Sequence, residues 1–358
     1  MILLFALFFF LGGVGSAEPV FYRSRTIPIQ ELVRQEGAFV ITDNKGLQVP
    51  VELWQHKSTK QIYWYRRLFT EVCLTGDCRP VDVGIYWNAS GNYLGIEVFR
   101  ENLTKTDHSV FSDFDYVKLE SILRNEWSPL REFEFEELVD DAPQGTDATT
   151  GATKKVIADA SVKDAVYTTY TLWHLIHVGE AEQLSLLTYR YLNRNPAVLE
   201  ATVKGHDIAY LNFLMEGVSA GHLQINQALV GVIIEGLDSD EAVLKNTAFR
   251  AISHLPLDDP SIQNEIAKVY AGWEPQDKTR FLRSFAQVKV LGDGLYQQLS
   301  ADITTENVWF LSALLPVLAK SKKQRPEVVE KIKVLQGSDN SALQDAVRLF
   351  LSELNLSP

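Results

Sequence analysis

Cysteine and methionine are scarce in this 358-residue chain, which has two of each. The cysteines, Cys73 and Cys78, are not part of a C-x-x-C-H sequence, so attachment of a c-type haem is excluded. In an oxidising compartment two cysteines this close, with Gly76 between them, predict a local disulfide that closes a small loop and stabilises modestly. A redox-active dithiol is the alternative, although its usual spacing is the shorter C-x-x-C.

Positive charge is also in short supply. Lys and Arg number 34 against 46 Asp and Glu, which gives a formal net charge of -12. An acidic surface repels phosphate groups, so nucleic acids and anionic membrane surfaces are excluded as partners recognised by charge. Hydrophobic residues make up 46% of the chain, an ordinary fraction for a folded protein, and the length favours two to three domains.

Long apolar runs are absent beyond Ile2–Leu11. This run, followed by the small residues Gly15 and Ala17, predicts a signal peptide over residues 1–17 with cleavage before Glu18. No Lys or Arg precedes the run, which leaves a buried apolar strand as the alternative. No cysteine follows that could carry a lipid. We therefore expect an extracytoplasmic protein, periplasmic or secreted, without stable membrane insertion.

Residues 18–178 have the pattern of an α+β domain. Runs rich in β-branched and aromatic residues predict strands at Gly37–Thr42, Val49–Trp54, Gln61–Val72, Val81–Trp87 and Tyr93–Phe99. Asn88–Asn92 tolerates positive φ and predicts a hairpin between the last two strands. Ser112 or Asp113 is expected to cap a helix that ends before Pro129, and another helix is expected over Ser161–Val178.

Residues 179–358 have an all-helical pattern. Amphipathic segments with short connections predict a helical-repeat domain, either a HEAT-like solenoid or a bundle, although the letters show no clean repeat. Helices are expected at Gln183–Asn193, Asp207–Gly217, Leu223–Leu237, Glu241–Leu255, Ile262–Trp273, Lys278–Val288, Asn307–Lys320, Glu327–Leu335 and Ala342–Leu354. Prolines should mark helix starts at Pro196, Pro260, Pro275 and Pro326. Asp238 followed by Glu241 predicts a cap with its reciprocal acid.

The region between the two patterns, Val139–Lys155, has almost no large apolar side chain. Within it, residues 147–153 read Asp-Ala-Thr-Thr-Gly-Ala-Thr. This run resembles the flavinylation motif of FMN-binding domains, as found in the flavin subunits of the Rnf and sodium-pumping NADH:quinone reductase complexes. That family requires Asp, Gly or Ala, any residue, Ser or Thr, Gly or Ala, Ala or Thr, and a final Thr. Every constrained position matches, at Asp147, Ala148, Thr150, Gly151, Ala152 and Thr153.

The resemblance, which covers about residues 70–178, implies that a flavin transferase joins FMN through its phosphate to the hydroxyl of Thr153. The small residues Gly151 and Ala152 would let the phosphate approach the backbone closely. Lys154 and Lys155 depart from the family, which more often has small or hydroxyl residues there, although their charge suits a phosphate. An ordinary interdomain linker rich in Pro, Gly, Thr and Asp is the alternative.

Aromatic and histidine side chains near this region are further candidates. One ring could stack on a flavin, although most are expected in the core: Tyr86, Trp87, Tyr93, Phe99, Tyr167, Tyr170 and Trp173. His174 and His177 have a spacing that suits two metal ligands on a helix, but no Cys or carboxylate completes a set, so no metal site is expected.

The sequence thus predicts an electron-transfer flavoprotein rather than a substrate-converting enzyme. FMN on Thr153 would relay electrons between extracytoplasmic redox partners, with the helical domain as a docking scaffold. One alternative is a non-catalytic helical-repeat interaction protein with a degenerate FMN-binding domain. Another is a thiol oxidoreductase that uses Cys73 and Cys78.

Overall fold

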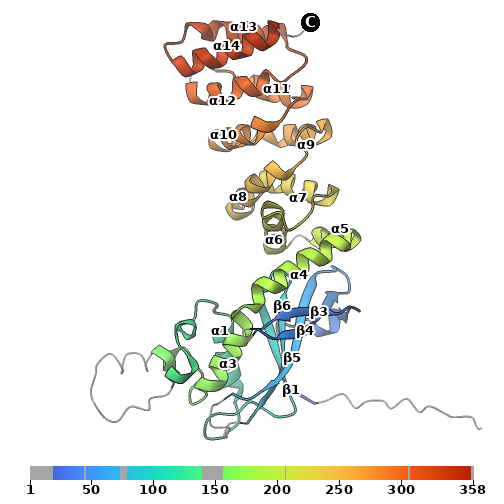
Figure 1. Cartoon of the computed structure of the whole chain (residues 1–358), viewed down its shortest axis with the longest axis vertical. Coiled ribbons are helices and arrows are strands. Elements are labelled where there is room, and N and C mark those ends of the chain that lie inside the picture. Colours follow the sequence, from blue (N-terminus) through green and yellow to red (C-terminus); the bar gives the residue numbers. More distant parts are fainter. Residues whose placement is uncertain are drawn as a thin grey trace, which may run out of the picture. The chain divides into compact units, whose positions relative to one another are not determined.

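The computed structural model describes residues 19–43, 46–72, 79–138, 156–205, 207–304 and 307–355. The chain divides into two compact units between Ser185 and Leu186. The first is α+β and the second is all-helical (Figure 1), as the sequence predicted. The expected signal peptide, residues 1–17, lies outside the described residues. Within the described ranges, no helix has the length and apolar character needed to cross a bilayer.

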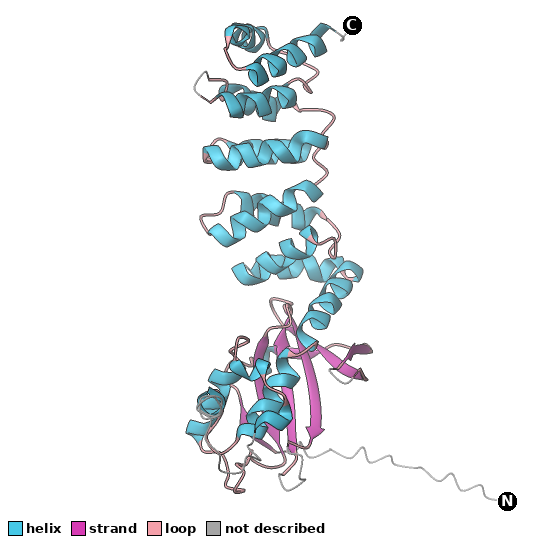
Figure 2. Ribbon diagram, turned by 60° about the vertical axis from the view of Figure 1, so that its left-hand side comes forward, coloured by secondary structure: helices cyan, strands magenta, loops and turns pink. Residues whose placement is uncertain are grey.

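The first unit contains an antiparallel sheet, magenta in Figure 2. Its seven described strands have the order β1–β7–β6–β5–β4–β2, with β3 paired to β4. The predicted strands and the β6–β7 hairpin are confirmed, whereas β1 and β2 were not predicted. The bounds are β1 (Val20–Arg23), β2 (Leu32–Arg34), β3 (Phe39–Thr42), β4 (Gln48–His56), β5 (Ile62–Thr70), β6 (Val81–Asn88) and β7 (Tyr93–Phe99).

Both faces of strand β6 are covered, which explains why all but its last residue are buried. Trp87 faces the helix α3 (Val166–His177), where its Nε1 donates to the carbonyl of Ile176 at 3.2 Å. Because side chains alternate along a strand, Tyr86 points to the opposite face. There it packs with Tyr65 and with Ile27 from the segment between β1 and β2.

Helix α1 (Asp113–Leu123) begins where the sequence predicted. The Ser112 side chain accepts a hydrogen bond from the backbone N–H of Asp115, whose carboxylate in turn accepts from the backbone of Ser112. This capping box satisfies two N–H groups at the helix start. Helix α3 starts later than expected because a turn precedes it, in which Asp164 has φ of +60°.

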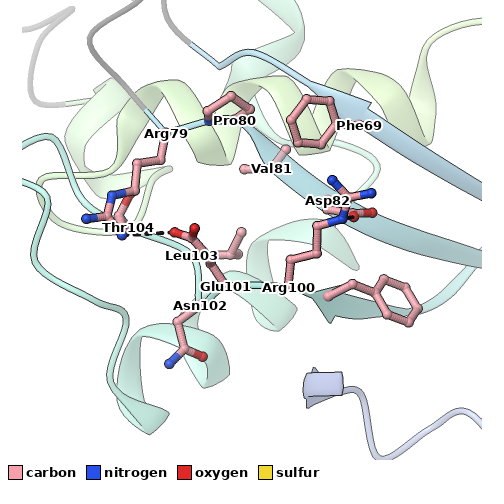
Figure 3. A pocket seen from close by; sticks show the side chains of 11 residues that line it. Phe69, Arg79, Pro80, Val81, Asp82, Arg100, Glu101, Asn102, Leu103 and Thr104 are labelled. Carbon is pink, nitrogen blue, oxygen red and sulfur yellow. Dashed lines mark hydrogen bonds and ion pairs between the residues drawn. The ribbon is translucent and has the colours of Figure 1, made fainter. Parts of the chain in front are cut away.

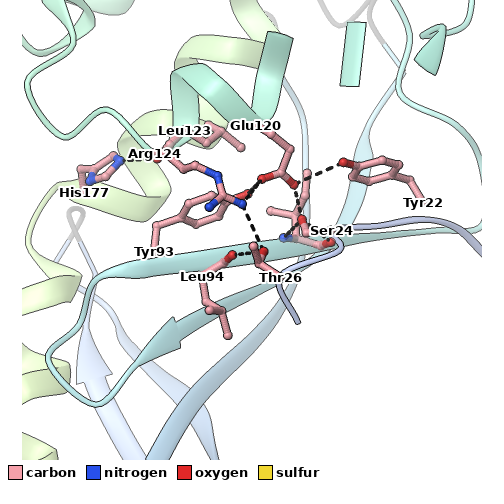
Figure 4. Close-up of polar contacts among 10 residues, drawn as sticks. Tyr22, Ser24, Thr26, Tyr93, Leu94, Glu120, Leu123, Arg124 and His177 are labelled. Atoms are coloured by element: carbon pink, nitrogen blue, oxygen red, sulfur yellow. Dashed lines mark hydrogen bonds and ion pairs between the residues drawn. The ribbon is translucent and has the colours of Figure 1, made fainter. Parts of the chain in front are cut away.

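Glu120 fastens α1 to the sheet (Figure 4). Its carboxylate accepts hydrogen bonds from Tyr22 at 3.4 Å and Tyr93 at 3.2 Å, and also from the hydroxyl of Ser24. Arg124, one turn later, places its Nη2 3.3 Å from the same carboxylate. Donors from β1 and β7 and from the residues that directly follow β1 and α1 therefore bind one carboxylate, whose charge strengthens the hydrogen bonds.

The second unit is formed by pairs of helices, and α4 crosses into it from the first unit. Described helices are α4 (Glu180–Arg194), α5 (Pro196–Thr202), α6 (Ile208–Ser219), α7 (Gln227–Leu237), α8 (Ala242–Ala251), α9 (Pro260–Tyr270), α10 (Pro275–Ser284), α11 (Asp293–Ala301), α12 (Val308–Leu318), α13 (Pro326–Val334) and α14 (Ser341–Asn355). All four prolines expected at helix starts occupy the first turn. Helix α11 was not predicted, and α5 was predicted only through its start at Pro196.

The helix pairs repeat at a constant interval. Helices α8, α10, α12 and α14 begin at residues 242, 275, 308 and 341, and α7, α9, α11 and α13 at 227, 260, 293 and 326, both at intervals of 33 residues. α6 packs on α8 and α12 on α14, while α7 packs on α9 and α9 on α11. This stacking is that of a solenoid and not of a bundle. HEAT repeats are longer, at about 40–47 residues, so a HEAT-like repeat stays a prediction of the sequence.

One predicted helix cap is wrong. Asp238 follows the last residue of α7 and does not cap α8, whose N-cap is Glu241 without a side-chain cap bond. Instead, the backbone N–H of Glu241 donates to the hydroxyl of Ser239 at 3.1 Å. The nearer hydroxyl therefore replaces the carboxylate that the spacing suggested.

Candidate functional site

The predicted attachment motif and the cysteine pair lie outside the described residues. Asp147, Ala148, Thr150, Gly151, Ala152 and Thr153 fall in residues 139–155, and Cys73 and Cys78 fall in residues 73–78. The described chain ends at Leu138 before the motif and resumes at Val156, three residues after Thr153. The residues on either side of the motif are therefore those whose geometry can be described.

Both flanks of the motif segment are attached to the first half of α3. On the preceding side, the hydroxyl of Tyr170 donates to the carbonyl of Phe133 at 2.8 Å, and the Phe135 ring lies 5.3 Å from that of Tyr167. On the following side, the backbone N–H of Val162 donates to Thr169 Oγ1 at 3.2 Å. The described segments before and after the motif thus contact the same helix.

A pocket of about 910 Å³ lies along this helix and is called the α3 pocket here. Tyr170, Phe133 and Phe135 contribute aromatic surface, and Tyr170 is buried. Phe135 meets Tyr170 edge to face at 5.6 Å between ring centroids, and Tyr170 stacks on His174 at 3.8 Å. The remaining lining is Thr70, Glu71, Arg131, Glu134, Glu136, Thr171, Leu175, His177, Val178 and Gly179.

The two histidines of α3 each face a backbone carbonyl. His174 Nδ1 lies 3.1 Å from the carbonyl oxygen of Tyr170, and His177 Nε2 lies 2.9 Å from that of Leu123. Burial lowers the pKa of both imidazoles, so both are neutral at pH 7. A neutral ring must then carry its proton on the nitrogen that faces the carbonyl. This assigns an N–H at Nδ1 of His174 and at Nε2 of His177.

Charge around the α3 pocket is mainly negative. Glu71, Glu134 and Glu136 line it against the single guanidinium of Arg131. Burial raises the pKa of the Tyr170 hydroxyl, and nearby glutamates add to the shift. Such a pocket disfavours a phosphate group but is compatible with an uncharged aromatic ring.

Most of the candidate aromatic residues serve the core, as expected. Trp87 and Trp173 are fully buried, and Trp173 Nε1 donates to the carbonyl of Asn125 at 2.9 Å. Tyr86 lies on the sheet face opposite α3, and Phe99 is buried. Of that group, only Tyr170 lines the α3 pocket.

The sequence reasoning missed Phe133 and Phe135. They lie in the run Arg-Glu-Phe-Glu-Phe-Glu-Glu, where aromatic residues alternate with acids just before the motif region. That alternation could have indicated aromatic side chains with a binding or packing role, because an acidic segment exposed to solvent does not require large rings. Its short 3-10 turns, Pro129–Glu132 and Phe135–Leu138, lack the periodicity by which a helix or strand is recognised.

Comparison with known proteins does not assign the chain to a family. No protein-family model matches the chain, and neither the curated proteins nor the solved structures gave a match. Across the described ranges, no group of three or more His, Cys, Asp or Glu residues is placed to hold a metal ion. The described part of the candidate site is therefore the α3 pocket.

Proposed function

We propose that this protein is an extracytoplasmic electron-transfer flavoprotein that carries FMN on Thr153. In this proposal a flavin transferase forms the phosphoester, and the protein relays electrons between redox protein partners. Bound FMN supplies one- and two-electron chemistry that amino-acid side chains lack. A covalent tether keeps the cofactor at high local concentration outside the cytoplasm, where free FMN would diffuse away.

The observation that carries the proposal is the attachment of both flanks of the motif segment to α3. Tyr170 holds the preceding flank at Phe133, and Thr169 holds the following flank at Val162. The same helix lines the α3 pocket. Both described flanks of the motif belong to the α+β unit, whereas an ordinary interdomain linker would connect two units.

The residues of the α3 pocket fit a flavin ring. Its volume of about 910 Å³ lies within the range of small-molecule sites, about 300–1,000 Å³. Tyr170 and Phe135 offer faces and edges for stacking, and neutral His174 offers an imidazole with a defined proton. The acidic rim suits the uncharged isoalloxazine better than the phosphate, which would stay at Thr153.

Mass spectrometry of the mature chain, co-expressed with a flavin transferase, tests attachment directly. The protein should be yellow after denaturation and heavier by FMN minus one water. Thr153→Val should remove this mass, because no hydroxyl remains to form the ester. Thr149→Val is the matched control, since the motif leaves that position unconstrained, and it should keep the mass.

A colourless chain that lacks the added mass after exposure to the transferase would contradict the proposal. The visible spectrum gives a second readout on the flavinylated protein. Tyr170→Ala should alter the shape of the flavin band by removing a ring beside the cofactor, whereas Leu349→Ala, on the exposed surface of α14, should not. If Tyr170→Ala and the wild type had the same flavin spectrum, the isoalloxazine ring would lie outside the α3 pocket.

The helical repeats favour a second candidate function, that of an interaction scaffold. Stacked helix pairs form extended surfaces that commonly bind proteins. This candidate predicts a folded protein without covalent flavin, so the same mass measurement separates the two functions.

A further inference from the structure

The corner that follows β7 has an unusual backbone. Arg100 has φ of +59°, in the left-handed region that glycine and asparagine enter at lower cost. The turn is tight, because the N–H of Glu101 donates to the carbonyl of Phe99 at 2.6 Å. An arginine in this backbone conformation costs free energy, and contacts of its side chain must offset that cost.

The corner directs two neighbouring side chains into two separate ion pairs. Arg100 Nε lies 2.8 Å from Asp82 Oδ2, and Arg79 Nη1 donates to Glu101 Oε2 at 2.9 Å. Figure 3 shows these pairs on opposite sides of one cavity. In an extended strand, the side chains of adjacent residues point to opposite faces of the sheet. At this turn, by contrast, Arg100 and Glu101 both line the same cavity.

The cavity between the pairs, called the arginine pocket here, has a volume of about 410 Å³. Its floor is apolar, since Val81 and Leu103 line it and are both buried. Phe69 lines it as well, with 61% of its surface exposed, and Arg100 lies 5.5 Å from the centroid of that ring. An exposed aromatic ring beside a guanidinium offers stacking and charge to the same ligand.

Arg100 shares its counter-ion with a second arginine. Asp82, a buried carboxylate, forms two hydrogen bonds of 2.9 Å with Arg67 and also pairs with Arg100. One negative charge therefore faces two positive charges. The Arg79–Glu101 pair on the other side of the pocket is neutral by itself. Because Asp82 also binds Arg67, it does not offset the charge of Arg100 alone, and the guanidinium of Arg100 is the group in this pocket that suits an anion.

We propose that the arginine pocket binds a small organic carboxylate with a flat apolar body. The carboxylate would pair with the guanidinium of Arg100, and the body would lie on Val81 and Leu103 beside the ring of Phe69. Planar guanidinium groups match carboxylates geometrically, which favours this anion over a spherical one. The volume suits one compact ligand and lies near the lower end of small-molecule sites, about 300–1,000 Å³. This site is independent of the flavin proposal.

Benzoate serves as the probe, in titration calorimetry or saturation-transfer NMR on the full mature chain. Benzamide has the same ring and shape without the charge and is the matched ligand control. We expect benzoate to bind at least about tenfold more tightly than benzamide, a difference of the size expected for one charged pair. Equal binding of the two, no binding of benzoate, or equally tight binding of sulfate would overturn the proposal.

Arg100→Asn separates a binding role from a structural one. Asparagine adopts the left-handed backbone more readily and Arg67 still pairs with Asp82, so the thermal midpoint should stay the same or rise while benzoate binding falls at least about tenfold. Arg34→Asn, at an exposed arginine paired with Glu52 elsewhere, should leave binding unchanged. A lower midpoint with unchanged benzoate binding would make Arg100 a structural residue and contradict the proposal.

Discussion

Glu180 is a buried carboxylate at the start of α4, and it shows how one residue can make stability depend on pH. Arg66 of β5 forms an ion pair with it, and Asp43 lies 4.0 Å from the same guanidinium. The second carboxylate oxygen, Oε2, has no hydrogen-bond partner among the described residues. Burial raises the pKa of Glu180 to about 7 in spite of Arg66, because desolvation outweighs the attraction.

The sign of the pH effect follows from this raised pKa. The folded state holds the proton more tightly than the unfolded state, so the stabilisation is complete below about pH 4.5 and is lost as pH rises through about 7. Glu180→Gln mimics the protonated form. Relative to the wild type, its free energy of unfolding should therefore increase by about 2 kcal/mol between pH 5 and pH 8.

Urea unfolding at several pH values measures this difference. Glu182→Gln, at an exposed glutamate in the same turn, should show no comparable change. A Glu180→Gln variant that becomes less stable than the wild type at pH 8 would mean that the ion pair with Arg66 dominates over burial.

At the scale of elements, the β6–β7 hairpin and the first turn of α4 are in close contact. Gly91 in the hairpin has φ of +80°, and a Cβ placed there would collide with the backbone carbonyl oxygen of Ala181. Gln183, one turn later in α4, donates to the carbonyl of Thr42 at 2.6 Å and accepts from its N–H at 2.8 Å. The side-chain amide thus satisfies the edge of β3, and α4 is held at two points of the sheet.

Gly91→Ala should therefore destabilise the first unit by about 2–4 kcal/mol, through a backbone clash added to the cost of positive φ. Gly179→Ala is the matched control, because Gly179 has φ of +82° and open space at its Cβ, and it should lose only about 1 kcal/mol. Thermal unfolding followed by near-UV circular dichroism measures both. Equal losses would show that the hairpin moves away from α4 without cost.

At the scale of the whole molecule, the 33-residue interval makes the helical unit modular. The same position of α6, α8, α10, α12 and α14 is fully buried in each of these helices, and it is occupied by Leu214, Ala248, Phe281, Leu314 and Val347 in turn. Neighbouring repeats are joined by polar contacts such as Arg280 Nη1 to Asn246 Oδ1 at 2.9 Å. Stability in such arrays is a sum over repeats and their interfaces.

Deletion of residues 274–306 should leave a folded protein, because Asn307 then follows Trp273 at the same point of the repeat. We expect helical circular dichroism and one cooperative transition at a lower temperature, since one repeat and one interface are lost. Deletion of the shorter stretch 274–290 removes α10 alone and puts every later helix in the wrong layer, so it should abolish cooperative unfolding. Equal behaviour of the two deletions would contradict the modular description.

One part of the functional site could be predicted from neighbouring residues, whereas the pockets depend on residues that are far apart in the sequence. The motif ending at Thr153 and its flavin were inferred from seven consecutive letters, and that inference remains a prediction. The α3 pocket could not be inferred, because it joins Glu71, Phe133 and His174 from three separate parts of the chain. The arginine pocket likewise depends on a backbone angle at Arg100 that its residue type does not suggest.

The sequence by itself determined the features that neighbouring residues control: the extended run of β6, the Ser112 cap of α1, and the proline starts of α5, α9, α10 and α13. Tertiary structure alone decided the place of β1, because its Tyr22 and the following Ser24 bind Glu120, nearly a hundred residues away. It also decided the 33-residue stacking, because packing selects the size and burial of a side chain and accepts Leu, Ala, Phe or Val at one position. Local rules act through the backbone of a few residues, whereas distant contacts exist only once the chain has folded.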